Sequence, residues 1–275
     1  MRRMNLAPKE VCMTPRALVV VITALVLACA TSPLGRRQLR LFPEADMDAM
    51  GVQAYEQIKG ETPATTDAGA SRYVRCVANA ITRALPASDG AGEWEVTVFE
   101  EDSPNAFALP GRKIGVHTGL LKVARNQSQL ATVVGHEVAH VLANHGNERM
   151  STAYAAQSSL SLAQVLAGEP SPQKQQIFAL LGVGAQVGVL LPFSRTQESE
   201  ADLLGLDLMA KAGFDPRQSV ELWRNMATAG GGQPSEWLST HPSHETRINE
   251  LQERIPQTMG LYEKARAAGT TPNCS

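Results

Sequence analysis

Apolar side chains recur every three or four residues along most of the chain, which is the spacing of amphipathic helices. The spacing appears from about residue 45 to 58 and again from 74 to 85. Five later stretches repeat it, at about 128–145, 173–191, 195–212, 216–228 and 243–254. The pattern predicts a predominantly helical chain in which Gly146 and Gly213 end helices and Pro216 opens one.

One short region departs from helical spacing and alternates apolar with polar residues. Between Trp94 and Val98, apolar positions are separated by Glu95 and Thr97, as in a half-buried strand. Apolar segments 106–109 and 114–117 follow, with a Pro-Gly turn between them. A small β-sheet among helices predicts an α+β, predominantly helical fold, and a single domain over residues 44–275 without internal repeats.

The N-terminal segment resembles an export signal. Residues 17–28 are an uncharged run of 12 behind several basic residues, too short to cross a bilayer, which needs roughly 20 apolar residues. Val26-Leu27-Ala28-Cys29 resembles a lipobox, which predicts a signal peptide over 1–28 and lipid attachment at Cys29. A plain cleavable signal, or a buried helix with an incidental cysteine, is the alternative. Translation could also start at Met13.

Residues 29–43 are expected to be a tether from the lipid, because two prolines and a glycine disfavour a helix there. Ala30, where inner-membrane retention favours Asp, predicts the periplasmic face of the bacterial outer membrane as the location. In that oxidising compartment Cys76 and Cys274 are an even pair, which indicates either a disulfide or two free thiols.

The charge balance excludes one class of partner. With 25 Lys and Arg against 27 Asp and Glu, the formal net charge is -2. A nucleic-acid-binding protein needs a basic surplus gathered on one face, so no nucleic-acid partner is expected. Function must therefore come from particular residues.

The sequence His136-Glu137-Val138-Ala139-His140 lies within a predicted helix and is an HExxH motif. At 3.6 residues per turn the two histidines stack on one face, where both can bind one metal ion. Glu137 points about 100° away, so its carboxylate can act as a general base without becoming a ligand. The motif predicts a metal-dependent hydrolase with one Zn²⁺ per chain.

A catalytic zinc typically takes three protein ligands and keeps a fourth position open. About 60 residues downstream, Glu198 and Asp202 share one helix face, together with Ala201 and Gly205. We expect Glu198 to be the third ligand and Asp202 to accept the N–H of a ligating histidine. Small residues on the same face would let this helix lie close to the metal helix. Glu200, nearly opposite, is interpreted as a solvated acid at a helix start.

The HExxH motif followed by ExxAD resembles zinc metallopeptidase family forty-eight, the CaaX prenyl endopeptidases and HtpX-like gluzincins. The resemblance extends to Asn105–Gly111, Ile114–Leu121 and the Thr240-His241-Pro242 stretch with Arg247. It covers most of residues 45–255 and looks like the periplasmic lipoprotein branch. Arg112 departs from the pattern, since a second glycine is frequent there.

This resemblance implies further roles. His241 would lie near the metal and could either stabilise the oxyanion or occupy the open zinc position. Arg247 could assist the oxyanion or brace the last helices. Gluzincins hold substrate against an exposed sheet edge, so Ile114, Gly115, Val116 and His117 are the candidate edge, with an interior strand as the alternative.

Three remaining features are interpreted structurally. His145, before Gly146, is taken as a helix C-terminal cap partner, and His244 is placed in the first turn of the last predicted helix. His117 itself is taken as structural. Residues 177–191 carry one polar residue in 15 and could touch a membrane or gate the cleft, although a buried helix is favoured.

The leading hypothesis is a lipid-anchored zinc endopeptidase that hydrolyses peptide bonds in misfolded envelope proteins. In it a metal-activated water attacks and Glu137 is the general base. The expected partners are unfolded protein or peptide substrates and a membrane. The alternative is a chaperone or assembly factor for outer-membrane proteins with a latent zinc site. A zinc-stabilised structural lipoprotein is disfavoured because Glu137 would be idle.

Overall fold

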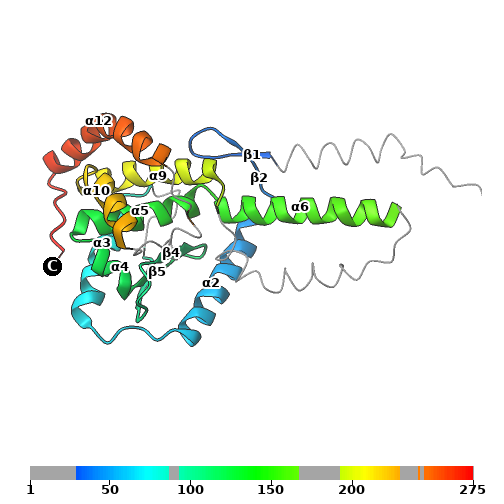
Figure 1. Cartoon of the computed structure of the whole chain (residues 1–275), viewed down its shortest axis with the longest axis horizontal. Coiled ribbons are helices and arrows are strands. Elements are labelled where there is room, and N and C mark those ends of the chain that lie inside the picture. Colours follow the sequence, from blue (N-terminus) through cyan, green and yellow to red (C-terminus); the bar gives the residue numbers. More distant parts are fainter. Residues whose placement is uncertain (1–28, 87–92, 167–192, 230–240, 242–244, 275) are drawn as a thin grey trace, which may run out of the picture.

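The computed structural model describes residues 29–86, 93–166, 193–229, 241 and 245–274. Within these ranges helices dominate, and one three-stranded sheet lies among them (Figure 1). The predicted fold class, α+β and predominantly helical, is confirmed. The predictions for residues 1–28 and 177–191 and for His244 lie outside the described residues.

The three-stranded sheet is built from β3 (Glu95–Phe99), β4 (Ala106–Leu109) and β5 (Lys113–His117). Its order is β3-β5-β4, with β5 parallel to β3 and antiparallel to β4. The predicted edge strand at Ile114, Gly115, Val116 and His117 is therefore wrong, because both sides of β5 are paired. The alternative of an interior strand is the one observed, and β3 and β4 are the two outer strands of the sheet as far as the described residues show.

The β4–β5 turn is held by helix α2 (Glu44–Glu61). Gly111 donates its backbone N–H to Asp48 Oδ1 at 2.8 Å. Both Gly111 (φ 78°) and Arg112 (φ 61°) take the left-handed backbone conformation that favours glycine. This conformation favours glycine at the position of Arg112, where the resemblance led us to expect a second glycine.

Six further helices are described, and all but one of them overlap a range predicted from the spacing. They are α3 (Ala68–Arg83), α4 (Thr118–Val123), α5 (Gln127–Leu142), α9 (Arg195–Lys211), α10 (Gln218–Ala229) and α12 (Glu245–Ala267). The side chain of Asn126 caps α5, and Ser194 with Gln197 forms a capping box at the start of α9. Helix α4 was not predicted, and α12 continues beyond the predicted end at residue 254.

Helix α5 is buried in the main core, and α9 crosses it at a pair of glycines. Val133, Val134 and Val138 of α5 are fully buried. A Cβ atom added at Gly205 would lie 2.7 Å from the backbone nitrogen of His136, and one at Gly135 would lie 2.9 Å from the carbonyl oxygen of Gly205. The expectation that small residues let the two helices lie close is confirmed.

The chain turns sharply between α5 and α6 (His145–Leu166). Helix α5 ends at Leu142, Asn144 adopts a φ of 54°, and a new helix starts at His145. The predicted helix stop at Gly146 is wrong, since this glycine lies in the first turn of α6. Figure 1 shows α6 projecting from the body of the described chain.

Residues 29–43, predicted to be a tether, instead contain a β-hairpin. Strands β1 (Cys29–Thr31) and β2 (Arg37–Leu39) pair antiparallel. Gln38 is buried and donates to the carbonyl oxygen of Ala143 at 2.6 Å, which fixes β2 to the α5–α6 turn. The prolines and glycine exclude a helix here, as expected, yet the segment packs on the domain.

The C-terminal tail is joined to the first half of the domain by a disulfide between Cys76 of α3 and Cys274. Of the two alternatives for these cysteines, the bridge is the one observed. Gln127 strengthens the junction by donating to the carbonyl oxygen of Pro272 and accepting from the backbone N–H of Cys274. In the described ranges, no helix combines the length and apolar character needed to span a bilayer.

Candidate metal centre

Four side chains from three parts of the chain meet between α5 and α9. Helix α5 provides His136 and His140, α9 provides Glu198, and His241 comes from the segment before α12. All four are buried, and one ligand atom from each lies within 4.8 Å of the others. The cluster therefore joins the predicted ligands to the histidine that the resemblance placed near the metal.

The spacing of these atoms fits a tetrahedral zinc ion. Ligands about 2.0–2.1 Å from one zinc ion are separated from each other by about 3.3–3.4 Å in a tetrahedron. The Nε2 atoms of His136 and His140 are 3.0 Å apart, and His136 Nε2 is 3.3 Å from His241 Nδ1. Glu198 oxygens lie 3.0 Å from His241 Nδ1, 3.5 Å from His140 Nε2 and 3.6 Å from His136 Nε2. Three imidazole nitrogens and one carboxylate are also a donor set that zinc prefers.

Asp202 and Arg247 fix the side of the cluster that faces α12. Asp202 Oδ1 is 2.9 Å from His136 Nδ1, as predicted for an acceptor of a ligand's N–H. Arg247 donates to both Asp202 oxygens at 2.6 and 2.8 Å, and its Nη1 lies 2.7 Å from Glu198 Oε2. Arg247 is 1% exposed and lies behind both carboxylates, which favours the bracing interpretation.

Burial and neighbouring charges set the protonation of this network. Burial alone would raise the pKa of Asp202, but the charge and hydrogen bonds of Arg247 lower it to about 2. Burial would lower the pKa of His136, yet Asp202 and Glu198 raise it overall. Burial and the neighbouring histidines hold the pKa of His140 well below its usual value. Without a metal the cluster therefore favours ionised carboxylates and a neutral His140.

Glu137 is buried next to the four-residue cluster and outside it. Its Oε1 lies 3.5 Å from His241 Nε2, whereas Nδ1 of the same ring is the nitrogen that lies 3.0 Å from Glu198 Oε1. The carboxylate therefore contacts a residue of the cluster without belonging to the cluster itself, which agrees with the expected helical offset. The ring of Phe193 packs against the rings of His140 and His241, with centroid separations of 3.7 Å and 5.1 Å.

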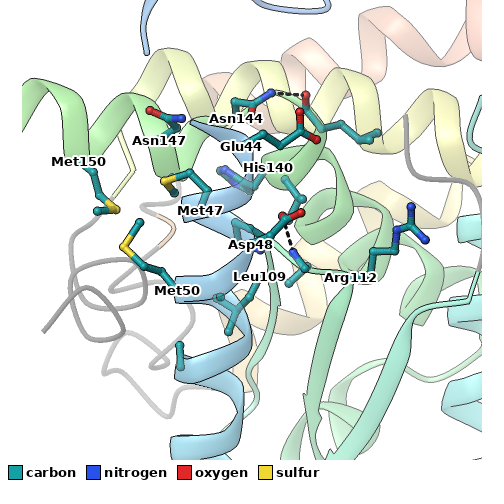
Figure 2. A pocket seen from close by; sticks show the side chains of 18 of the residues that line it. Glu44, Met47, Asp48, Met50, Leu109, Arg112, His140, Asn144, Asn147 and Met150 are labelled. Atoms are coloured by element: carbon teal, nitrogen blue, oxygen red, sulfur yellow. Dashed lines mark hydrogen bonds between the residues drawn. The ribbon is translucent and has the colours of Figure 1, made fainter. Parts of the chain in front are cut away.

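A pocket of about 400 Å³ opens beside His140. Its walls come from α2, β4 and the α5–α6 turn, and its lining includes Ala108 and Leu109 of the sheet edge. Figure 2 shows Met47, Met50 and Met150 gathered on one side. The pocket is therefore largely apolar near the methionines and reaches both the edge strand and a candidate ligand.

The remaining predicted residues lie elsewhere or behave differently. His117, the last residue of β5, shares a hydrogen bond between its Nδ1 and the Oγ of Ser103 at 2.9 Å, which agrees with its structural interpretation. His145 is fully buried and its Nδ1 lies 2.9 Å from His140 Nδ1, so its assignment as a helix C-terminal cap partner is wrong. Glu200 is 4% exposed and is not a solvated acid. His145 lies five residues after His140, the last residue of HExxH, and this proximity in the sequence was the signal that could have linked His145 to the metal centre.

Comparison with known proteins identifies the family. Residues 69–255 match the family model that is described as "Peptidase family M48". The mitochondrial metalloendopeptidase OMA1 of Schizosaccharomyces pombe is 38% identical over 60% of this chain and 48% of its own length. The OMA1 of Bos taurus is 34% identical over 84% of this chain and 45% of its own length. The β-barrel assembly-enhancing protease of Escherichia coli is 28% identical over 76% of this chain and 43% of its own length.

These relatives correct the predicted location. A lipid-anchored position at the periplasmic face of the bacterial outer membrane is contradicted, because the OMA1 relatives are named as mitochondrial and share more identity with the chain than the bacterial protease does. The lipobox pattern spans only four residues, and so short a pattern does not determine the subcellular location by itself. The chain spans about half the length of the curated relatives it matches.

Proposed function

Because this chain belongs to peptidase family M48, we propose that it is a zinc-dependent endopeptidase that hydrolyses peptide bonds in unfolded proteins. One observation carries the proposal. His136, His140 and Glu198 converge with zinc-like spacing, while Glu137, next to His136 in α5, contacts His241 and lies outside the cluster. The names of the relatives support a protease and do not favour the alternative of a chaperone with a latent zinc site.

The chain's own residues divide the work. Zinc bound at the cluster would lower the pKa of water and polarise the scissile carbonyl. Glu137 takes the proton of the attacking water on its carboxylate and returns it to the leaving amine. Asp202 holds His136 in the tautomer that leaves Nε2 free for the metal. Arg247 keeps Asp202 and Glu198 ionised and in place.

His241 is proposed to fill the fourth position until substrate arrives. Its Nδ1 lies 3.0 Å from Glu198 and 3.3 Å from His136, which is the separation expected of a further ligand. Substrate would have to displace this ring before its carbonyl could approach. Replacement by alanine should weaken zinc binding and change the rate of peptide cleavage, and a variant unchanged in both would exclude this role.

The free edge of β4 is proposed to receive the substrate as an added strand. Among the described residues β4 pairs with β5 alone, and Ala108 and Leu109 share the pocket with His140. An added strand bonds through its backbone, so many sequences can bind. N-methylation of single amides along a peptide substrate should slow cleavage at alternate positions, since strand amides alternate in direction. Equal effects at all positions would exclude strand pairing.

The experiment that tests the function compares Glu137→Gln with the wild type. Zinc content and cleavage of unfolded casein are measured on the same preparations, with and without a chelator. We expect zinc to be retained and cleavage to be lost in Glu137→Gln. Glu221→Gln is the matched control, because Glu221 lies on the exposed face of α10 and contacts Arg224. Cleavage that persists in Glu137→Gln would refute the proposal.

Attachment of a lipid to Cys29 stays a prediction from the sequence and implies no particular compartment here. Labelling with a palmitate analogue should be lost in Cys29→Ala if the thiol is acylated. Unchanged labelling would exclude it.

A further inference from the structure

A network of buried polar groups begins at the ring nitrogen of His140 that points away from the proposed metal position. His145 Nδ1 lies 2.9 Å from His140 Nδ1, and His145 Nε2 lies 3.2 Å from Glu200 Oε2. His145 is fully buried and Glu200 is 4% exposed. These contacts use the ring nitrogen of His140 that does not face His136 and Glu198.

The network continues to Arg36 in the N-terminal hairpin. Arg36 donates from Nε to Glu200 Oε2 at 2.9 Å, and its Nη2 donates to Glu148 Oε2 at 2.7 Å. Glu148 in turn accepts from Gln197 Nε2 at 2.8 Å. Arg36 therefore joins the hairpin to α6 and α9 through two carboxylates at once.

Zinc binding at His140 would fix which atom donates and which accepts in each hydrogen bond of this network. A histidine that binds zinc through Nε2 carries its proton on Nδ1 and donates it to a neighbouring acceptor. For His136 the acceptor is Asp202. For His140 the group in reach is His145 Nδ1, which can accept only if the proton of His145 is on Nε2. That proton then points at the Glu200 carboxylate, which Arg36 holds.

We infer that His145, Glu200 and Arg36 are positioning residues that orient His140 for zinc, so that the N-terminal hairpin is part of the metal centre. His136 receives its orientation directly from Asp202, and His140 receives its orientation from Glu200 through His145. The inference rests on the proposed function only in that zinc binds at His140.

The first test measures zinc affinity by competition with a chromophoric chelator. Partners of metal ligands typically contribute about 10–100-fold to metal affinity, so His145→Ala should bind zinc about 10–100-fold more weakly than the wild type. His145→Gln should restore most of the loss, because its side-chain oxygen can accept from His140 while its NH₂ group donates to Glu200. No loss in His145→Ala, or no recovery in His145→Gln, would overturn the inference.

The second test uses a pair of arginine variants that act on the same helix. Arg36→Gln removes the cation that holds Glu200, whereas Arg254→Gln removes a comparable ion pair with Asp207 of α9. The two arginine side chains are similarly exposed, at 25% and 31%. Arg36→Gln should weaken zinc binding several-fold and Arg254→Gln should not. Equal zinc affinities in the two variants would refute the connection, and this pair decides the matter if His145→Ala does not fold.

A double variant checks that the residues act in series. Arg36→Gln added to His145→Ala should lower zinc affinity little further, because the connection is already broken; independent, multiplying effects would contradict the relay. Zinc affinity is measured without any peptide. A wild type that binds zinc and cleaves nothing would thus refute the proposed function and leave this inference standing.

Discussion

Gly205→Ala is the substitution that most directly tests how the metal centre is built. The added methyl group would lie 2.7 Å from the backbone nitrogen of His136 and 2.9 Å from the carbonyl carbon of Gly135. Non-bonded carbon contacts are comfortable at about 3.5 Å or more, so the shortfall is about 0.6–0.8 Å. Because the obstructing atoms belong to the backbone of α5, no side chain can rotate away, and the helices must separate.

The expected magnitude follows from two opposing effects. Forcing extra volume into a packed core typically costs about 1–3 kcal/mol, and here the upper end applies because backbone meets backbone. Alanine favours a helix over glycine by about 1 kcal/mol, which offsets part of that cost. We therefore expect the free energy of unfolding to fall by about 2 kcal/mol. Zinc affinity should also fall, since metal sites tolerate ligand shifts of only about 0.2 Å.

Gly260→Ala is the matched control. Gly260 lies in α12, and an added Cβ there would meet nothing within 4 Å. The same substitution should therefore raise the free energy of unfolding by about 0.5–1 kcal/mol and leave zinc affinity unchanged. Urea unfolding of both metal-free variants and a chelator competition would decide. If Gly205→Ala equals the wild type in stability and zinc affinity, the tight helix crossing is not a requirement of the site.

Three further outcomes can be measured. Replacing Cys76 and Cys274 with serine removes a bridge across a sequence separation of 198 residues, which should lower the free energy of unfolding by about 2–5 kcal/mol; equal urea midpoints would contradict this. Burial raises the pKa of Tyr55 to about 12, so the folded state keeps the phenol proton longer than the unfolded state does. Stability from this group is full below about pH 10 and falls by up to about 2.7 kcal/mol towards pH 12, and unfolding at pH 9 and 11 should show a smaller fall in Tyr55→Phe. Gly115→Ala would place a methyl group 2.2 Å from the ring of Phe107 and should destabilise the sheet by about 1–3 kcal/mol, whereas an unchanged thermal midpoint would mean that the ring moves freely.

Local spacing was sufficient to predict the ligand helices. The HExxH motif fixes two imidazoles on one face by helical geometry alone, and ExxAD places Glu198 and Asp202 on a common face in the same way. The structure brings these groups together as expected. The structure adds a capping box that the sequence analysis did not identify, in which Ser194 and Gln197 satisfy each other's backbone at the N-terminus of α9.

The features that sequence reasoning missed depend on contacts between distant segments. The pattern of residues 114–117 shows a strand but not its neighbours, so the position of β5 between β3 and β4 could not be read from it. A continuous helix to residue 145 would turn His145 about 140° away from His140. The helix break at Asn144 instead turns His145 towards His140, so that their Nδ1 atoms lie 2.9 Å apart. Glu200 does face away from Glu198, as expected, but α6 and the hairpin occupy that side instead of water.

The bridge between Cys76 and Cys274 has a practical consequence for a protein proposed to cut peptide bonds. Any internal cleavage between these two residues, including cleavage by another copy of the same chain, would leave both fragments covalently joined. Such a nicked molecule would migrate as one species on a non-reducing gel and separate only after a thiol is added. Self-processing of this chain should therefore be sought on gels run in both ways.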